Sequence, residues 1–102
     1  MKDYKLSYLP IFNADLAEVW KYIAIDLRNP TAADNLMLDT EKAILKRVKA
    51  PLSFEQYHSK KERRYPYYRI HIRNFTVWYV VIENKMEVRR FLYSKRDIEE
   101  LL

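Results

Sequence analysis

Hydrophobic residues in the first third of the chain occur at strand spacing and then at helical spacing. Residues 4–9 alternate between apolar and polar side chains, which predicts a short strand that Pro10 ends. Asn13 is a suitable N-cap for the helix that follows, and its apolar face would consist of Leu16, Val19, Trp20, Ile23 and Leu27. We therefore expect the first helix to extend to about Leu27.

The dipeptide Asn29-Pro30 interrupts the helical pattern and predicts a break in the chain. Thr31 can cap a second helix that extends to about Lys49. The side chains that this helix would turn toward the core are Leu36, Met37, Ile44 and Val48. Two helices with so short a break between them are typical of an antiparallel helical hairpin.

The second half of the chain changes to the two-residue period of strands. Residues 51–66 show no period and predict a loop. Three strands are then predicted, with breaks short enough for tight hairpins, over residues 67–73, 75–83 and 86–93. The middle strand is apolar on both faces, which indicates a central strand covered on both sides. Ser94 followed by Asp97 resembles a capping box and predicts a short C-terminal helix.

The order of these elements predicts a single α+β domain over residues 1–102. We expect a helical hairpin packed on one face of an antiparallel meander, with the N-terminal strand at an edge of the sheet and the short helix at the C-terminus. A chain of 102 residues, 49% hydrophobic and 32% charged, can bury a small core and is typical of a soluble protein.

Composition excludes several classes of site. The chain has no cysteine and two histidines, so it lacks the residues for a disulfide scaffold or for a metal centre built from thiolates or imidazoles. It has no glycine, which excludes the glycine-rich phosphate loops and leaves positive-φ turn positions to asparagines such as Asn29, Asn74 and Asn84. We expect no cofactor and no metal. No apolar run is long enough for a membrane span and no signal peptide is visible, so we expect a cytoplasmic protein.

The net charge of +5 is concentrated in one part of the chain. Residues 42–73 contain ten basic and two acidic residues, interleaved with aromatic residues. Cations between stacking rings are typical of single-stranded nucleic-acid binding, and the residues that we expect to contribute are Lys60, Lys61, Arg63, Arg64 and Lys95. The alternative is a solvated loop whose tyrosines cover the edge of the core.

The strand over residues 67–73 carries a second basic feature. Strand alternation predicts Arg69, His71 and Arg73 on one face. A neutral imidazole beside guanidinium groups can accept a proton while the arginines hold a phosphate, and the alternative is a surface histidine without a role. Lys95 and Arg96, in the first turn of the predicted C-terminal helix, would form an anion site or pair with nearby carboxylates.

Two stretches carry a resemblance to a known family. "YKLSYLP", followed by a helix pair broken at "NP", and "YYRIHIRNFTVWYVVIENKMEVRRFLYSKRDIEELL" resemble the RelE/ParE superfamily of toxins from bacterial type II toxin–antitoxin systems, the addiction modules that stabilise plasmids. The resemblance implies one of two activities. RelE-like members are metal-independent endoribonucleases that cut mRNA in the ribosome, whereas ParE-like members poison DNA gyrase. It also implies a cognate acidic antitoxin and a toxin–antitoxin hetero-oligomer.

The resemblance assigns roles to residues of this chain. It places Arg69 and His71 at two basic positions of the first meander strand in RelE-like enzymes, Arg73 at a third, and Arg96 in the C-terminal "KR" pair. Thr76 lies where the nucleases carry an arginine, and Leu102 lies near the position of an expected catalytic tyrosine, for which Tyr93 would substitute.

Three functional hypotheses follow. The first is a nuclease in which Arg69, Arg73 and Arg96 hold the scissile phosphate while His71 or Tyr93 transfers the proton. The second is a gyrase inhibitor that uses the same basic surface without covalent chemistry. The third is a nucleic-acid or protein binding module without toxicity.

Overall fold

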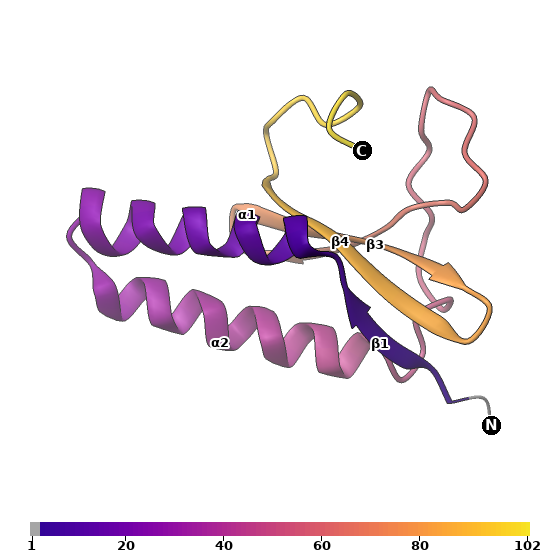
Figure 1. The fold of residues 1–102 in the computed structure, drawn as a ribbon, viewed down its shortest axis with the longest axis horizontal. Helices are drawn as coiled ribbons and strands as arrows, with labels where there is room; N and C mark the ends of the chain where they lie inside the picture. Colours follow the sequence, from indigo (N-terminus) through magenta and orange to yellow (C-terminus); the bar gives the residue numbers. More distant parts are fainter. Residues whose placement is uncertain (1–2) are drawn as a thin grey trace.

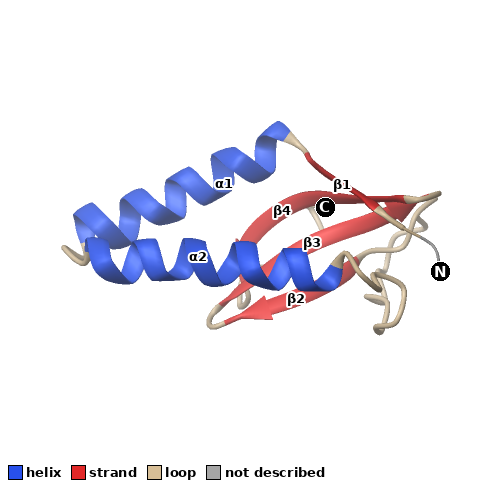
Figure 2. Cartoon of the chain, turned by 90° about the horizontal axis from the view of Figure 1, so that it is seen from below, coloured by secondary structure: helices blue, strands red, loops and turns tan. Residues whose placement is uncertain are grey.

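The structure, a computed structural model, describes residues 3–102 and has a helical layer on a sheet layer. The elements in chain order are β1 (Lys5–Tyr8), α1 (Pro10–Lys21), the π-helix η1 (Tyr22–Asp26), α2 (Pro30–Arg47), β2 (Tyr68–Ile72), β3 (Phe75–Ile82) and β4 (Lys85–Tyr93). α1 and α2 lie side by side (Figure 1), and both lie on one side of the sheet (Figure 2). No helix among these residues is long and apolar enough to cross a membrane.

The sheet has the strand order β1-β4-β3-β2. β2, β3 and β4 form the predicted antiparallel meander. β1 lies at the edge, as expected, and pairs with β4 in parallel from Lys5↔Lys85 to Tyr8↔Val88. The complete sheet is therefore mixed, and the helical hairpin is part of the connection that makes β1 and β4 parallel.

Both helices begin a few residues from where the sequence pattern places them. α1 begins at Pro10 with Leu9 as the N-cap, so Asn13 lies inside the helix. Proline is suited to the first turn because its missing N–H would have no partner there. Asn29 rather than Thr31 caps α2, and its side-chain oxygen accepts a hydrogen bond from Ala32 N at 3.1 Å. α1 continues through η1, so the first helix of the hairpin ends near Leu27 as predicted.

The face of the sheet toward the helices holds the larger hydrophobic cluster. Tyr68, Ile70 and Ile72 alternate inward along β2, as predicted, and pack with residues of both helices. Phe12 of α1 and Leu36 of α2 are each 1% exposed. Burying a side chain of this size contributes about 1.5–3 kcal/mol, so this cluster fixes the helical hairpin on the sheet.

The opposite face of the sheet is covered by irregular chain. The long loop between α2 and β2 and the segment after β4 both pass over it (Figure 1) and enclose a second cluster of Tyr67, Trp78, Val80 and Leu92. Ile98, Leu101 and Leu102 pack against this cluster from the C-terminal segment. β3 is thus covered on both sides, as its two apolar faces predict.

The predicted C-terminal helix is not formed. Residues 94–102 make turns, in which Arg96 N bonds Tyr93 O and Leu101 N bonds Ile98 O. The Ser94 hydroxyl does not cap a helix, because it forms a hydrogen bond of 2.8 Å with the Thr76 hydroxyl instead. Packing on the second cluster therefore prevails over the local capping signal.

Three residues take positive φ in this chain without glycine: Arg28 (54°), Arg73 (54°) and Glu83 (57°). Each precedes one of the asparagines that the composition favours for this conformation, so that prediction is wrong by one residue. In the two hairpins the reason is geometric, because both primed two-residue turns require positive φ at the first turn residue.

Candidate functional site

Arg69 and His71 lie on the sheet face opposite the helices. Both follow from the alternation of β2, and they pair across the ladder with Trp78 and Thr76 of β3. The Arg69 guanidinium lies 5.2 Å from the centre of the Tyr57 ring. His71 is exposed, and its Nδ1 atom lies 3.2 Å from the Thr76 hydroxyl oxygen.

Arg73 does not continue this row, which corrects the predicted alignment of three residues. β2 ends at Ile72, and Arg73 is the first residue of the hairpin turn with positive φ. Its guanidinium forms an ion pair with Asp39 of α2, on the helical side of the sheet. The cationic row of β2 therefore consists of Arg69 and His71.

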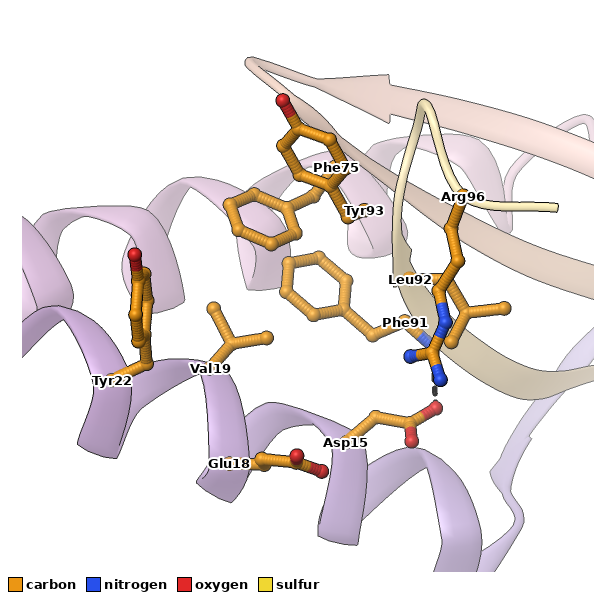
Figure 3. Close-up of a pocket in the computed structure, with 9 residues that line it drawn as sticks. All are labelled: Asp15, Glu18, Val19, Tyr22, Phe75, Phe91, Leu92, Tyr93 and Arg96. Carbon is orange, nitrogen blue, oxygen red and sulfur yellow. Dashed lines mark hydrogen bonds between the residues drawn. The ribbon is translucent and has the colours of Figure 1, made fainter. Parts of the chain in front are cut away.

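Tyr93 and Arg96 lie beside the helical hairpin instead of beside His71. Tyr93 pairs with Phe75 and packs edge-on against its ring at 5.9 Å, which puts it on the helical side. Both residues line a hollow of about 440 Å³ between α1 and the end of β4. Figure 3 shows the Arg96 side chain pointing into this hollow toward Asp15. The five predicted catalytic residues thus do not form one cluster: two, Arg69 and His71, lie on the face opposite the helices, and the other three lie on the helical side of the sheet.

A chain of hydrogen bonds connects His71 with Ser94. Thr76 is 1% exposed, and its hydroxyl bonds both His71 Nδ1 and the Ser94 hydroxyl, at 3.2 and 2.8 Å. Thr76 stands where the nuclease pattern carries an arginine, so this position supplies a neutral hydroxyl that orients the imidazole. These hydrogen-bonded groups can hold a proton, but they contribute no positive charge that could stabilise a phosphate.

Two of the expected nucleic-acid-binding residues are bound to the C-terminal segment. The Lys61 ammonium donates to Glu99 O at 2.8 Å, and Arg63 lies 3.6 Å from the Glu99 carboxylate. Arg64 stacks on Tyr65, with its guanidinium 5.4 Å from the ring centre. The side chains of Lys60 and Lys95 are exposed. Of the five expected residues, only Arg63 is partly buried and beside a carboxylate, whereas Lys61 and Arg64 remain exposed as well.

Glu99 was not singled out by the sequence, yet it is the centre of this cluster. Its carboxylate accepts hydrogen bonds from Lys60 N (3.0 Å), the Tyr57 hydroxyl (2.8 Å) and the Ser59 hydroxyl (3.0 and 3.3 Å). These donors, with Lys60 N first, lower the pKa of Glu99 to about 2. We call these groups, with Arg63, the Glu99 site.

Asp15 is the second residue that sequence reasoning missed. Its carboxylate binds Arg90 through Nε and Nη2, at 2.8 and 3.0 Å, and accepts the Phe91 N–H at 3.0 Å. The hydrogen bonds to Asp15 raise the pKa of Arg90. A β-bulge in β4 opposite Trp78 and Tyr79 makes this contact compatible with the pairing of the strand. An acidic residue next to the apolar face of α1 was the available signal.

A second hollow, of about 400 Å³, continues the first around the end of the sheet. The two hollows share Tyr22, Phe75 and Tyr93, and the second reaches Leu27 and Arg73. Tyr22 and Leu27 are 52% and 55% exposed, so the hairpin tip presents apolar surface beside cationic side chains. Together these hollows form one groove between the tip of the helical hairpin and the end of the sheet, which we call the tip groove.

Residues 3–102 contain no group of three histidine or acidic side chains that could hold a metal ion. The arrangement offers binding surfaces, a chain of neutral hydroxyl groups and the three arginine–carboxylate contacts described above.

Comparisons with known proteins agree with this fold. The family model described as the ParE toxin of the type II toxin–antitoxin system parDE matches residues 6–98. A solved structure titled as the chromosomal ParDE system from P. aeruginosa contains a chain with a TM-score of 0.72 and 13% identity, over 91% of this chain and 98% of that one. A search of curated protein sequences found no match. The match to the family model over nearly the whole chain shows that this protein belongs to the ParE toxin family of type II toxin–antitoxin systems.

Proposed function

We propose that this protein is a toxin that acts by binding DNA gyrase and not by cleaving mRNA. The observation that carries the proposal is the separation of the five candidate catalytic residues. Arg69 and His71 lie on one face of the sheet, whereas Tyr93 and Arg96 lie beside α1. A general base must be within hydrogen-bond reach of the proton it takes while the cations contact the same phosphate, and groups on opposite faces cannot meet that condition.

Membership of the ParE family supports the same conclusion. ParE-like members of the superfamily poison gyrase without nuclease chemistry, and the family model matched by this chain is the ParE model. Thr76 adds a second support, because the position of the nuclease arginine holds a buried hydroxyl instead.

We also propose an acidic antitoxin as the partner of this chain, with the tip groove as the surface that it covers. The groove combines exposed apolar side chains, such as Tyr22 and Tyr93, with the cation Arg96. An amphipathic segment with carboxylates along one edge would satisfy both features. Because the apolar part does not depend on ionic strength, salt should weaken this complex without abolishing it.

The test compares variants of the two histidines during controlled expression in bacteria. If the toxin acts on gyrase, His71→Ala retains full toxicity, and a DNA-damage reporter responds before protein synthesis falls. His58→Ala is the matched control, because His58 is also exposed and carries an equivalent ring. Purified toxin should inhibit supercoiling by gyrase with unchanged potency in both variants.

Folded His71→Ala protein that has lost toxicity, together with cut mRNA before any DNA damage, would overturn the proposal. It would favour the second candidate function, the nuclease, for which the hydrogen-bonded chain from His71 through Thr76 to Ser94 is the specific support.

A further inference from the structure

We propose that the Glu99 site is a binding site for an external carboxylate, and that Glu99 is an internal occupant which the acidic side chain of a peptide partner can replace. The proposal rests on the acidic antitoxin proposed above only for the identity of that partner. The site itself is argued from the groups that surround the carboxylate.

The first observation is the number and arrangement of donors. The loop that precedes β2 supplies two hydroxyls and a backbone N–H to one carboxylate, with all contacts between 2.8 and 3.3 Å. Ser59 bonds both oxygens, and Arg63 Nη2 lies 3.6 Å from Oε2. Donors spread over two oxygens in this way recognise a carboxylate by its shape and its charge.

The second observation is that the site has donor capacity to spare. Arg63 Nη2 is buried and has no hydrogen-bond partner, and the Arg63 side chain as a whole is 16% exposed. Arg63 Nε is held by the Ser59 hydroxyl at 2.9 Å, which fixes the plane of the guanidinium. A carboxylate placed slightly closer than that of Glu99 would accept a hydrogen bond from the free Nη2, because a charge-assisted hydrogen bond is the favourable contact between a guanidinium and a carboxylate.

The third observation is that the donors belong to one segment and the acceptor to another. Tyr57, Ser59, Lys60 and Arg63 lie within seven consecutive positions of the loop, and the hydrogen bond from Arg63 Nε to the Ser59 hydroxyl does not involve Glu99. Glu99 belongs to the turns after β4, and the Lys61 contact to its backbone is exposed. The donors therefore form a site that does not depend on the C-terminal segment for its composition.

Exchange at this site would have a structural consequence. Ile98, Leu101 and Leu102 cover the cluster of Tyr67 and Trp78, and the Glu99 contacts hold the same segment in place. A partner carboxylate that displaced Glu99 would free these residues to move and expose apolar surface for the rest of the partner. Trp78, which is 3% exposed, reports such a change.

The first experiment is rescue by a small carboxylate. Glu99→Ala should lower Tm, and sodium acetate should raise it again relative to sodium chloride of equal ionic strength. Glu100→Ala is the matched control, because Glu100 is exposed and adjacent. Acetate should leave the control and the wild-type chain unchanged, and Glu99→Ala combined with Arg63→Met should not be rescued. If Glu99→Ala does not fold, Glu99→Ser replaces it, since a short polar side chain also leaves the position of the carboxylate open.

The second experiment tests exchange with a peptide. The probe is the blocked peptide Asp-Ile-Glu-Glu-Leu-Leu, and its control carries Gln at the first Glu. Acrylamide quenching of Trp78 in a Trp20→Phe background measures binding. The probe should bind Glu99→Ala at least about tenfold more tightly than its control does, since charge-assisted hydrogen bonds are worth more than neutral ones. It should bind the wild-type chain more weakly, because Glu99 competes within the same molecule.

Equal effects of acetate on Glu99→Ala and Glu100→Ala, or equal binding of the two peptides, would overturn the inference. These outcomes are separable from a failure of the proposed function. If acetate rescues Glu99→Ala but the antitoxin does not bind, the proposed partner is wrong and the carboxylate site stands. If the antitoxin binds fully but acetate does not rescue Glu99→Ala, only the proposed carboxylate site is wrong.

Discussion

Removal of the Asp15 carboxylate is the perturbation with the largest effect that the structure predicts outside the apolar core. Asp15 and Arg90 side chains are 10% and 15% exposed, and the carboxylate also accepts the buried Phe91 N–H. Asp15→Ala leaves a buried guanidinium without its counter-ion and an amide without its acceptor. Breaking a buried pair on one side costs about 3–5 kcal/mol, a large share of the roughly 5–15 kcal/mol that stabilises a domain.

An exposed ion pair in the same protein provides a reference for this loss of stability. Asp39 and Arg73 form an ion pair with side chains that are 49% and 48% exposed. Exposed pairs contribute about 0–1 kcal/mol, so Asp39→Ala should be close to neutral. At roughly 4 °C per kcal/mol for a domain of this size, Asp15→Ala should lower Tm by about 12 °C or more, and Asp39→Ala by a few degrees at most.

The assay is urea unfolding of both variants, followed by circular dichroism, with thermal melts as a second measurement. Asp15→Asn should fall between wild type and Asp15→Ala, because the amide oxygen can still accept the Phe91 N–H. Asp15→Ala combined with Arg90→Met should recover part of the loss, since it removes the unpaired charge. A loss of less than about 1 kcal/mol for Asp15→Ala, equal to that of Asp39→Ala, would refute the reasoning.

Three further predictions concern other contacts. Because the pKa of Glu99 is lowered from 4.5 to about 2, its contacts stabilise the fold above pH 4.5, and this contribution is lost as the pH falls toward 2. Glu99→Gln removes the titrating group, whereas Glu100→Gln keeps it. The Tm of Glu99→Gln should therefore fall less between pH 4.5 and pH 2 than the Tm of Glu100→Gln. Tyr79→Phe removes the hydroxyl that donates to Pro51 O at 2.7 Å and accepts from Arg47 at 2.9 Å, and should cost about 1–3 kcal/mol in urea unfolding. Glu83→Asn should raise stability by about 0.5 kcal/mol, because asparagine tolerates the positive φ at this exposed turn better; a loss of stability would contradict that explanation.

The elements of the fold could be predicted because their signals are local. The two-residue period of β2 and the apolar faces of β3 specify which side chains are buried, and the structure confirms both. The C-terminal helix could not be judged in this way. The sequence shows Asp97 at the position of a capping-box partner for Ser94. It does not show Thr76, which comes within hydrogen-bond distance of the Ser94 hydroxyl only after β3 and β4 pair. A local signal was replaced by a contact that depends on the sheet.

The site residues were predictable as types but not as a constellation. Alternation places Arg69 and His71 together correctly, whereas Arg73 falls one residue past the end of the strand, where alternation no longer applies. The Glu99 site brings together residues about forty positions apart in irregular chain, for which no period exists. Such contacts arise from tertiary packing, so composition predicted a solvent-facing basic loop but not that Arg63 and the neighbouring donors of this loop would surround the Glu99 carboxylate.

The parallel pairing of β1 with β4 has a consequence for the order of events during synthesis. β1 precedes both helices and the other strands but pairs with β4, so the four-stranded sheet cannot close until β4 has been synthesised. Until then the apolar face of the helical hairpin lacks most of the surface on which it packs. Pairings this distant along the chain slow folding and leave incomplete chains open to aggregation and proteolysis. For a toxin, the same connectivity means that translation interrupted before β4 yields fragments without the complete sheet, so that activity of the folded domain depends on synthesis through β4.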